Sequence, residues 1–146
     1  MDNQIIDKLV EMLQLDEKQN FMIVFDAFGY KIADLVTEGI TRKNIPFCAR
    51  FIPLFTQLQY SKHRPLPECF IENLKHSEAV IFAFSDHDGC TRFRSTVLKI
   101  AVDQNCKILH LPGVDQKLFV ETVNYPAASC WASGFCVPAC TRAGLT

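Results

Sequence analysis

The chain has 146 residues, a formal net charge of -1, 49% hydrophobic residues and 21% charged residues. This length fits one domain, and this balance is typical of a globular protein, which excludes disordered, collagen-like and coiled-coil chains. The near-zero charge argues against nucleic acid as a partner, because nucleic-acid-binding surfaces carry a clear excess of basic residues. No apolar run approaches the ~20 residues of a membrane helix, so no membrane partner is expected.

The cysteine content and the first residues bear on the compartment. Seven cysteines are an odd number, so they cannot all pair within one chain. Residues 1–4 read Met-Asp-Asn-Gln and contain neither the basic nor the apolar region of a secretory signal. We therefore expect a cytoplasmic protein whose thiols are reduced.

The first third of the chain alternates helical and strand patterns. Residues 4–14 place apolar side chains at helical spacing and predict an amphipathic helix. Residues 21–28 run almost continuously apolar, which predicts a strand buried on both faces and broken by Gly29. Residues 31–41 return to helical spacing and predict a second helix.

The middle of the chain is more polar. Residues 47–53 predict a second strand, and Arg50 within it indicates an edge position or a half-exposed face. Residues 54–67 are rich in polar side chains and end in prolines, so they are expected to be a polar connection. A short helix is predicted over residues 68–75.

The last third repeats the alternation. Residues 79–84 are the clearest buried strand, and residues 85–89 form a turn. Helical spacing resumes from Phe93 to Ala101, and Asn105 ends that helix. A fourth strand is predicted over residues 107–111. Asp115 can then cap a last helix, for which burial of Leu118, Phe119 and Val123 is expected.

The alternation predicts an α/β fold with a small parallel-type sheet of about four strands and helices on both faces, Rossmann-like or flavodoxin-like. This α/β domain covers residues 1–124. Residues 125–146 form an irregular tail rich in Cys and Ala, with Arg142 as its one charged residue. The tail is either a native loop-like terminus or the product of a shifted reading frame or truncation, and the sequence leaves both open.

The best candidate site is the turn between the third predicted strand and the helix that follows it. In open α/β sheets, ligands bind beyond the carboxyl ends of the strands. A helix N-terminus adds partial positive charge and free N–H groups, which suits a small anion. The same residue types are also ordinary N-caps and turn formers, and that structural interpretation stays open. The candidate ligand-binding residues are Ser85, His87, Asp88, Thr91 and Arg94.

Other arrangements offer little support for catalysis or for a metal. His87 and Cys90, beside two aspartates, lack the partner pair that a four-ligand zinc site needs. The cysteines at 130, 136 and 140 lack zinc-finger spacing. Asp26, at the end of the first strand, either faces a ligand or turns the chain. The glycine-rich nucleotide motifs are absent. We therefore expect no cofactor, no metal and no catalytic residue in this chain.

Four stretches of the chain include a Thr-x-x-Arg helix start at residues 91–94 and a Leu-Pro-Gly-Val turn at residues 111–114. Together the four stretches resemble the N-terminal domain of the thermophilic metallo-aminopeptidases, the aminopeptidase T family. The resemblance covers roughly residues 4–124 and depends most on the helix start and the turn. The chain departs from the family at residues 89–91, which read Gly-Cys-Thr in place of Thr-His-Thr. The four stretches are residues 20–26, 77–85, 90–94 and 106–114, the last followed by Lys117, Leu118 and Phe119.

The resemblance implies an aminopeptidase-like N-terminal domain that is non-catalytic by itself. Members of the family remove N-terminal residues from peptides with two metal ions, whose ligands belong to a larger C-terminal domain. A peptide substrate and a divalent metal are therefore expected only in a full-length relative. The implied partners are the missing catalytic domain or a second copy, giving a homo-oligomer. The alternative is a stand-alone α/β module that binds a small molecule or an anion, or that associates through an open sheet edge.

Overall fold

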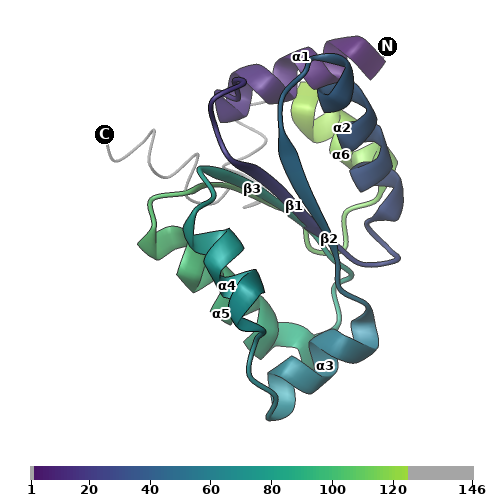
Figure 1. Ribbon diagram of the computed structural model, residues 1–146. Helices are drawn as coiled ribbons and strands as arrows, with labels where there is room; N and C mark the ends of the chain where they lie inside the picture. Colours follow the sequence, from purple (N-terminus) through teal and green to yellow (C-terminus); the bar gives the residue numbers. More distant parts are fainter. Residues whose placement is uncertain (1, 125–146) are drawn as a thin grey trace.

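The two continuous apolar runs of the sequence form the central strands of the sheet. The computed structural model describes residues 2–124, where four parallel strands lie in the order β2-β1-β3-β4 between two layers of helices (Figure 1). The predicted α/β architecture with helices on both faces is confirmed. The strands are β1 (Phe21–Phe25), β2 (Phe47–Phe51), β3 (Ala79–Ala83) and β4 (Lys107–His110).

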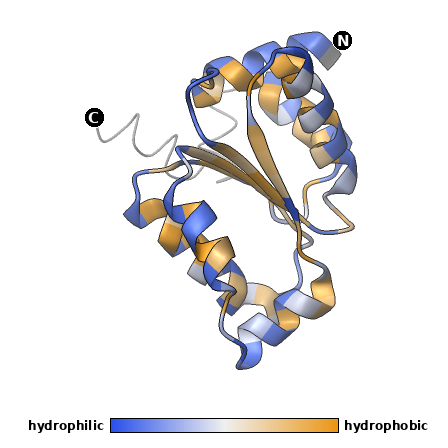
Figure 2. Cartoon of the chain, viewed as in Figure 1, coloured by the Kyte–Doolittle hydropathy of each residue, from blue (hydrophilic) through white to orange (hydrophobic). Residues whose placement is uncertain are grey.

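Two groups of helices cover the two faces of the sheet (Figure 1). One face packs against α1 (Asp2–Leu13), α2 (Tyr30–Arg42) and α6 (Gln116–Asn124). The other face packs against α4 (Glu68–Lys75) and α5 (Thr91–Asp103), with α3 (Leu54–Lys62) beside α5. Figure 2 shows an almost wholly hydrophobic sheet between helices of mixed hydropathy. No helix among residues 2–124 is both long enough and apolar enough to cross a membrane.

The central strands owe their buried positions to side chains that are apolar on both faces. In β1, Phe21 and Ile23 join the core under α2, whereas Met22 and Val24 join the core under α4. Alternate side chains of a strand point to opposite faces, so a continuous apolar run fills both cores at once. β3 is buried along its whole length for the same reason.

The second strand confirms the expectation drawn from Arg50. β2 pairs only with β1 among the described residues, and its burial alternates between exposed and intermediate. Phe47 and Phe51 keep 37% and 52% of their surface exposed. Within residues 2–124, β2 is therefore an edge strand with no neighbouring strand on its outer side.

The structure corrects two expectations. Residues 54–62 form helix α3 instead of a polar connection. The helical spacing escapes detection because the buried residues of α3 are polar, Gln57 and Ser61, so no apolar stripe marks its inner face. Leu118, expected in the core, is 39% exposed, whereas Phe119 and Val123 are fully buried. The predicted cap is confirmed, since the Asp115 carboxylate accepts the backbone N–H of Leu118 at 2.8 Å.

The end of β1 is set by a close approach of two backbones. A Cβ atom on Gly29 would overlap the carbonyl oxygen of Ala83 at the end of β3. The backbone N–H of Asp26 donates to that same oxygen at 3.3 Å. Only a residue without a side chain fits here, so Gly29 lets the first turn of α2 lie against β3. The tail, residues 125–146, lies outside the described residues.

Candidate functional site

The strand order reverses between β1 and β3. β1 is followed in the chain by β2 on one side of it, and β3 is followed by β4 on the other side. In open parallel sheets this reversal leaves a crevice at the carboxyl ends of the two strands, where ligands bind. Asp26 follows β1 and the turn from Ser85 to Thr91 follows β3, so the fold places the predicted site at this position.

Asp26 is the most highly connected polar side chain at this position. It is 2% exposed. Its Oδ1 accepts the backbone N–H groups of Phe28 and Gly29, at 3.0 and 3.2 Å. Its Oδ2 accepts the N–H and the hydroxyl of Ser85, at 2.8 and 3.0 Å, and Nε2 of Gln57 at 3.0 Å. The carboxylate therefore joins the ends of β1 and β3 to α3. Its bonds to the N–H groups of Phe28 and Gly29 turn the chain after β1, which is one of the two roles hypothesised for Asp26.

Arg94 closes the turn that follows β3. Its side chain is 11% exposed. One guanidinium nitrogen donates to the carbonyl oxygen of His87 at 2.8 Å and lies 3.5 Å from that of Ser85. The other lies 3.6 Å from the Asp86 carboxylate and 3.5 Å from the Thr91 hydroxyl. The positive charge expected to meet an anion is thus directed at acceptors of its own turn.

The remaining candidate residues also have partners within the turn. The Thr91 hydroxyl donates to the carbonyl oxygen of Asp88 at 2.8 Å. Nδ1 of His87 accepts the backbone N–H of Gly89 at 3.0 Å, which caps the 3₁₀ turn η1 (Asp88–Cys90). The structure therefore brings the predicted residues together, and an anion would have to displace these internal contacts. Ligand binding by them stays a prediction.

Gln57 is a site residue that the sequence analysis missed. It is fully buried, and its Nε2 donates to Asp26 and, at 2.9 Å, to the carbonyl oxygen of Ile52. Its Oε1 is buried and has no hydrogen-bond partner in the described part of the chain. Gln57 and Ser61 are four residues apart, and the hydroxyl of Ser61 accepts the N–H of Phe93 at 3.0 Å. That spacing of polar side chains was the available signal for a helix with a polar inner face.

His110, at the carboxyl end of β4, is a partly buried side chain near the turn. Its Nε2 atom is buried and has no hydrogen-bond partner among residues 2–124. Burial, assisted by the nearby Arg94 guanidinium, lowers the pKa of His110 to about 4. The ring lies edge-on to Phe82, with centroids 6.4 Å apart. The imidazole is therefore neutral at physiological pH.

Metal coordination finds no support within residues 2–124. No group of three or more His, Cys, Asp or Glu side chains in that range is placed to hold a metal ion. His87 uses Nδ1 within its own turn, and Cys90 is fully buried. The cysteines at positions 130, 136 and 140 lie outside the described residues.

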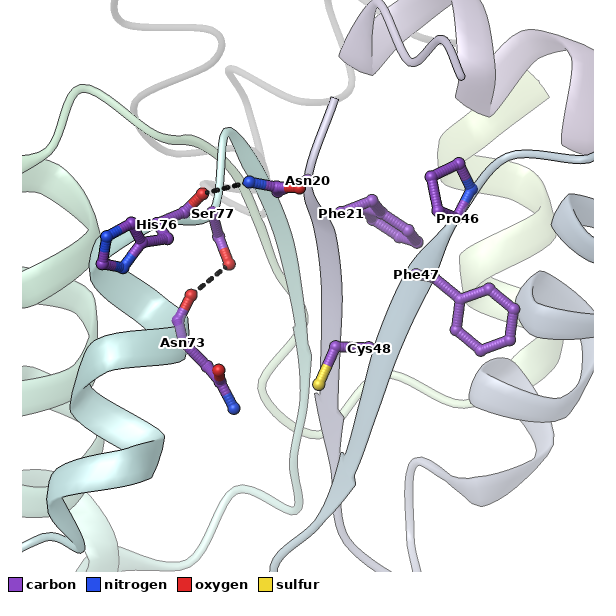
Figure 3. A pocket seen from close by; sticks show the side chains of 8 residues that line it. All are labelled: Asn20, Phe21, Pro46, Phe47, Cys48, Asn73, His76 and Ser77. Atoms are coloured by element: carbon purple, nitrogen blue, oxygen red, sulfur yellow. Dashed lines mark hydrogen bonds between the residues drawn. The ribbon is translucent and has the colours of Figure 1, made fainter. Parts of the chain in front are cut away.

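A cavity of about 310 Å³ lies at the opposite, amino-terminal edge of the sheet (Figure 3). One wall is closed by two hydrogen bonds, from Asn20 to the carbonyl oxygen of His76 and from Ser77 to that of Asn73. In Figure 3 the Cys48 sulfur projects from β2 toward Asn73. The cavity includes none of the predicted site residues. Its lining comprises Asn20, Phe21, Pro46, Phe47, Cys48, Asn73, His76 and Ser77.

Exposed aromatic side chains gather where β1 and β2 end. We call Phe28, Tyr30, Phe51 and Phe55 the aromatic rim; they are 48%, 57%, 52% and 70% exposed. Phe25, at the end of β1, links two of them. Its ring centroid lies 5.5 Å from that of Phe51 and 6.4 Å from that of Tyr30. Tyr30 and Phe51 therefore pack against a partly buried ring.

Comparisons of the chain with protein-family models, with curated proteins and with solved structures find no match. The resemblance to the aminopeptidase T family therefore stays a prediction. The same holds for the partners, the cofactors and the cytoplasmic location that the sequence led us to expect.

Proposed function

We propose that the chain is a non-catalytic α/β domain that attaches to another protein surface through the aromatic rim. The exposure of the four rim side chains is the observation that carries this proposal. Exposed apolar patches mark association sites, and aromatic side chains are enriched at protein interfaces. Phe55, at 70% exposure, is the most exposed of the four side chains.

The proposal agrees with the role that the family resemblance implies. An aminopeptidase-like N-terminal domain would provide a scaffold, and its partner would be a metal-binding catalytic domain or a second copy. The polar groups at the carboxyl ends of β1 and β3 support a structural role. Asp26, Ser85 and Arg94 are all engaged with neighbouring groups of the fold.

A second candidate function follows from the buried Oε1 atom of Gln57. That acceptor lies on the same side chain as the amide that donates to Asp26, and it has no donor of its own within residues 2–124. An unpaired acceptor of this kind would bind a small molecule that donates hydrogen bonds in preference to an anion. A saturable rise in melting temperature with small amines or amides, and none with phosphate, would support this candidate, because a ligand that binds only the folded state stabilises it. The reverse result would favour the anion hypothesis for the turn.

Photo-crosslinking tests the attachment surface. A photoreactive phenylalanine analogue at position 55 should give one discrete crosslinked product in the cells that express the chain. Val102 on α5 is the matched control, because it is also apolar and 44% exposed but lies outside the rim. Products of equal yield from both positions, or none from position 55, would refute the rim as an attachment surface.

A peptidase assay tests the non-catalytic part of the proposal. The purified chain is incubated with short peptides and with zinc, cobalt or manganese ions. We expect no release of N-terminal residues above the metal-only control. Release that increases with enzyme concentration and stops on addition of a chelator would show that the domain is catalytic.

A further inference from the structure

We propose that β2 pairs in an antiparallel manner with β2 of a second copy of the chain, which joins the two sheets into one. The inference rests on the proposed function, because Phe51 belongs both to β2 and to the aromatic rim. Here the partner is a second copy of the chain, and the contact is a β2–β2 pairing in a defined register.

The outer edge of β2 carries a defined set of backbone groups. The N–H of Ile52 donates to the carbonyl oxygen of Phe25 at 2.8 Å, so the backbone of Ile52 faces β1. Successive residues of a strand direct their N–H and C=O groups to opposite sides. The N–H and C=O groups of Phe47, Ala49 and Phe51 therefore point away from β1, and among residues 2–124 the sheet has no strand beyond β2.

The outward N–H and C=O groups of β2 are complementary to those of a second, antiparallel β2 in one register. A two-fold axis through Ala49 places Ala49 opposite the partner's Ala49, and Phe47 opposite the partner's Phe51. Every residue with outward-facing groups then meets another such residue. In antiparallel pairs of this kind each residue exchanges two hydrogen bonds, so the register forms about six of them. A shift by one residue would place outward groups opposite groups already bound to β1.

The side chains of β2 agree with the same register. Its sequence, Phe-Cys-Ala-Arg-Phe, has an aromatic residue at each end, so two cross-strand Phe–Phe pairs form. A two-fold axis normal to the sheet keeps both rings of each pair on one face. The rings of Phe47 and Phe51, now 37% and 52% exposed, would cover one another.

The charge on the strand does not oppose the pairing. Arg50 is the sole charged residue of β2 and would lie opposite the partner's Cys48, which is neutral. Its guanidinium carbon sits 5.6 Å from the centroid of the Phe70 ring on α4, so the charge lies over the sheet face and not at the edge. The strand also lacks the lysine or proline with which edges commonly block pairing. A second copy is the partner that this symmetric pattern fits best.

Sedimentation over a wide range of protein concentration tests the inference. We expect a reversible monomer–dimer equilibrium in the micromolar range, because a five-residue strand is short for a stable interface. Ala49→Pro removes an outward N–H without removing a bond to β1, and Ala49→Lys adds a charge at the edge. Each should raise the dissociation constant at least tenfold while circular dichroism remains native, whereas the control Val102→Lys should leave it unchanged. A wild-type chain that stays monomeric, or a dimer that both Ala49 variants retain, would overturn the proposal.

A cysteine substitution tests the register. Residues opposite one another in a hydrogen-bonded antiparallel pair have Cα atoms about 5.5 Å apart, which suits a disulfide. Ala49→Cys should therefore give, under mild oxidation, a covalent dimer that peptide mapping shows to be linked through position 49 and not through the exposed Cys69. Val102→Cys should give no dimer linked through position 102. A dimer in sedimentation that Ala49→Cys fails to trap would contradict the register.

Failure of this inference can be distinguished from failure of the proposed function. A monomeric chain whose position 55 crosslinks to a different protein would reject the β2 dimer and uphold the rim. A dimer trapped through Ala49→Cys, together with no crosslink from position 55, would uphold the pairing and reject the rim as the attachment surface.

Discussion

Replacing Asp26 by alanine should remove a large part of the stability of this domain. The variant leaves three backbone N–H groups without their acceptor, those of Phe28, Gly29 and Ser85. A buried donor that loses its partner costs about 1–3 kcal/mol. Because the Ser85 hydroxyl can rotate and Gln57 keeps its bond to Ile52, we expect a total loss of about 4 kcal/mol. The folding free energy of a domain is only about 5–15 kcal/mol.

Urea denaturation followed by circular dichroism measures this loss. With a slope of about 2 kcal/mol per molar urea, a loss of 4 kcal/mol lowers the unfolding midpoint by about 2 M. Asp16 provides the matched control. Its carboxylate also accepts two backbone N–H groups, those of Lys18 and Gln19 at 2.8 and 3.0 Å, but in an exposed turn. Asp16→Ala should cost about 1 kcal/mol or less, because water replaces the carboxylate there.

Comparison of the losses for Asp26→Ala and Asp16→Ala tests whether burial makes the Asp26 contacts stabilising. If Asp26→Ala costs no more than Asp16→Ala, burial of the Asp26 contacts does not stabilise the junction of β1, β3 and α3. Asp26→Asn gives a further check. The asparagine keeps an oxygen acceptor for the N–H groups of Phe28 and Gly29, but its amide N–H would point toward the donors of Ser85 and Gln57. The loss of stability for Asp26→Asn should therefore fall between the losses for Asp26→Ala and Asp16→Ala.

Three further outcomes are expected. Gly29→Ala should leave little folded protein at room temperature by circular dichroism, because the added methyl group overlaps a β3 carbonyl oxygen; a native melting curve would contradict this. The folded-state pKa of about 4 for His110 lies below its ordinary value of 6.5, so the unfolded chain binds the proton first. The stability that neutral His110 provides is therefore present above pH 6.5 and is lost as the pH falls toward 4, by up to about 3 kcal/mol. Urea melts at pH 7 and 4.5 should show a smaller loss for His110→Leu than for the wild type. Iodoacetamide should modify the exposed Cys69 in the folded protein, as peptide mapping can show. Cys90 is fully buried, and burial raises the pKa of its thiol, so it should react only after unfolding.

The strands were predictable because their apolar runs carry a physical requirement. β1 and β3 lie between two helical layers, so both of their faces must be apolar, and that requirement is visible in the sequence as an uninterrupted run. The edge position of β2 was predictable for the complementary reason, since Arg50 interrupts its run. Strand ends were less well predicted, because β1 stops where the Asp26 carboxylate turns the backbone, and hydrogen bonds of this kind leave no periodic signal.

The candidate site was only partly predictable. The sequence placed the turn from Ser85 to Thr91 at the carboxyl end of a strand, and the structure has it there. It did not reveal that Arg94 would bind carbonyl oxygens of its own turn, because these acceptors are backbone atoms that any sequence provides. Gln57 escaped prediction because it pairs with a residue far away in the chain. Contacts between distant polar residues require the tertiary structure.

The polar inner face of α3 has a consequence for local opening. Most helices of this domain are held by apolar packing, whereas the buried residues of α3 are Gln57 and Ser61, held by hydrogen bonds to groups on other segments. Water can replace such bonds when the helix lifts away, so α3 should exchange its amide hydrogens through a subglobal opening, before the sheet does. Phe55 lies in the first turn of this helix. The most exposed ring of the rim is thus carried by the helix that we expect to open before the sheet does.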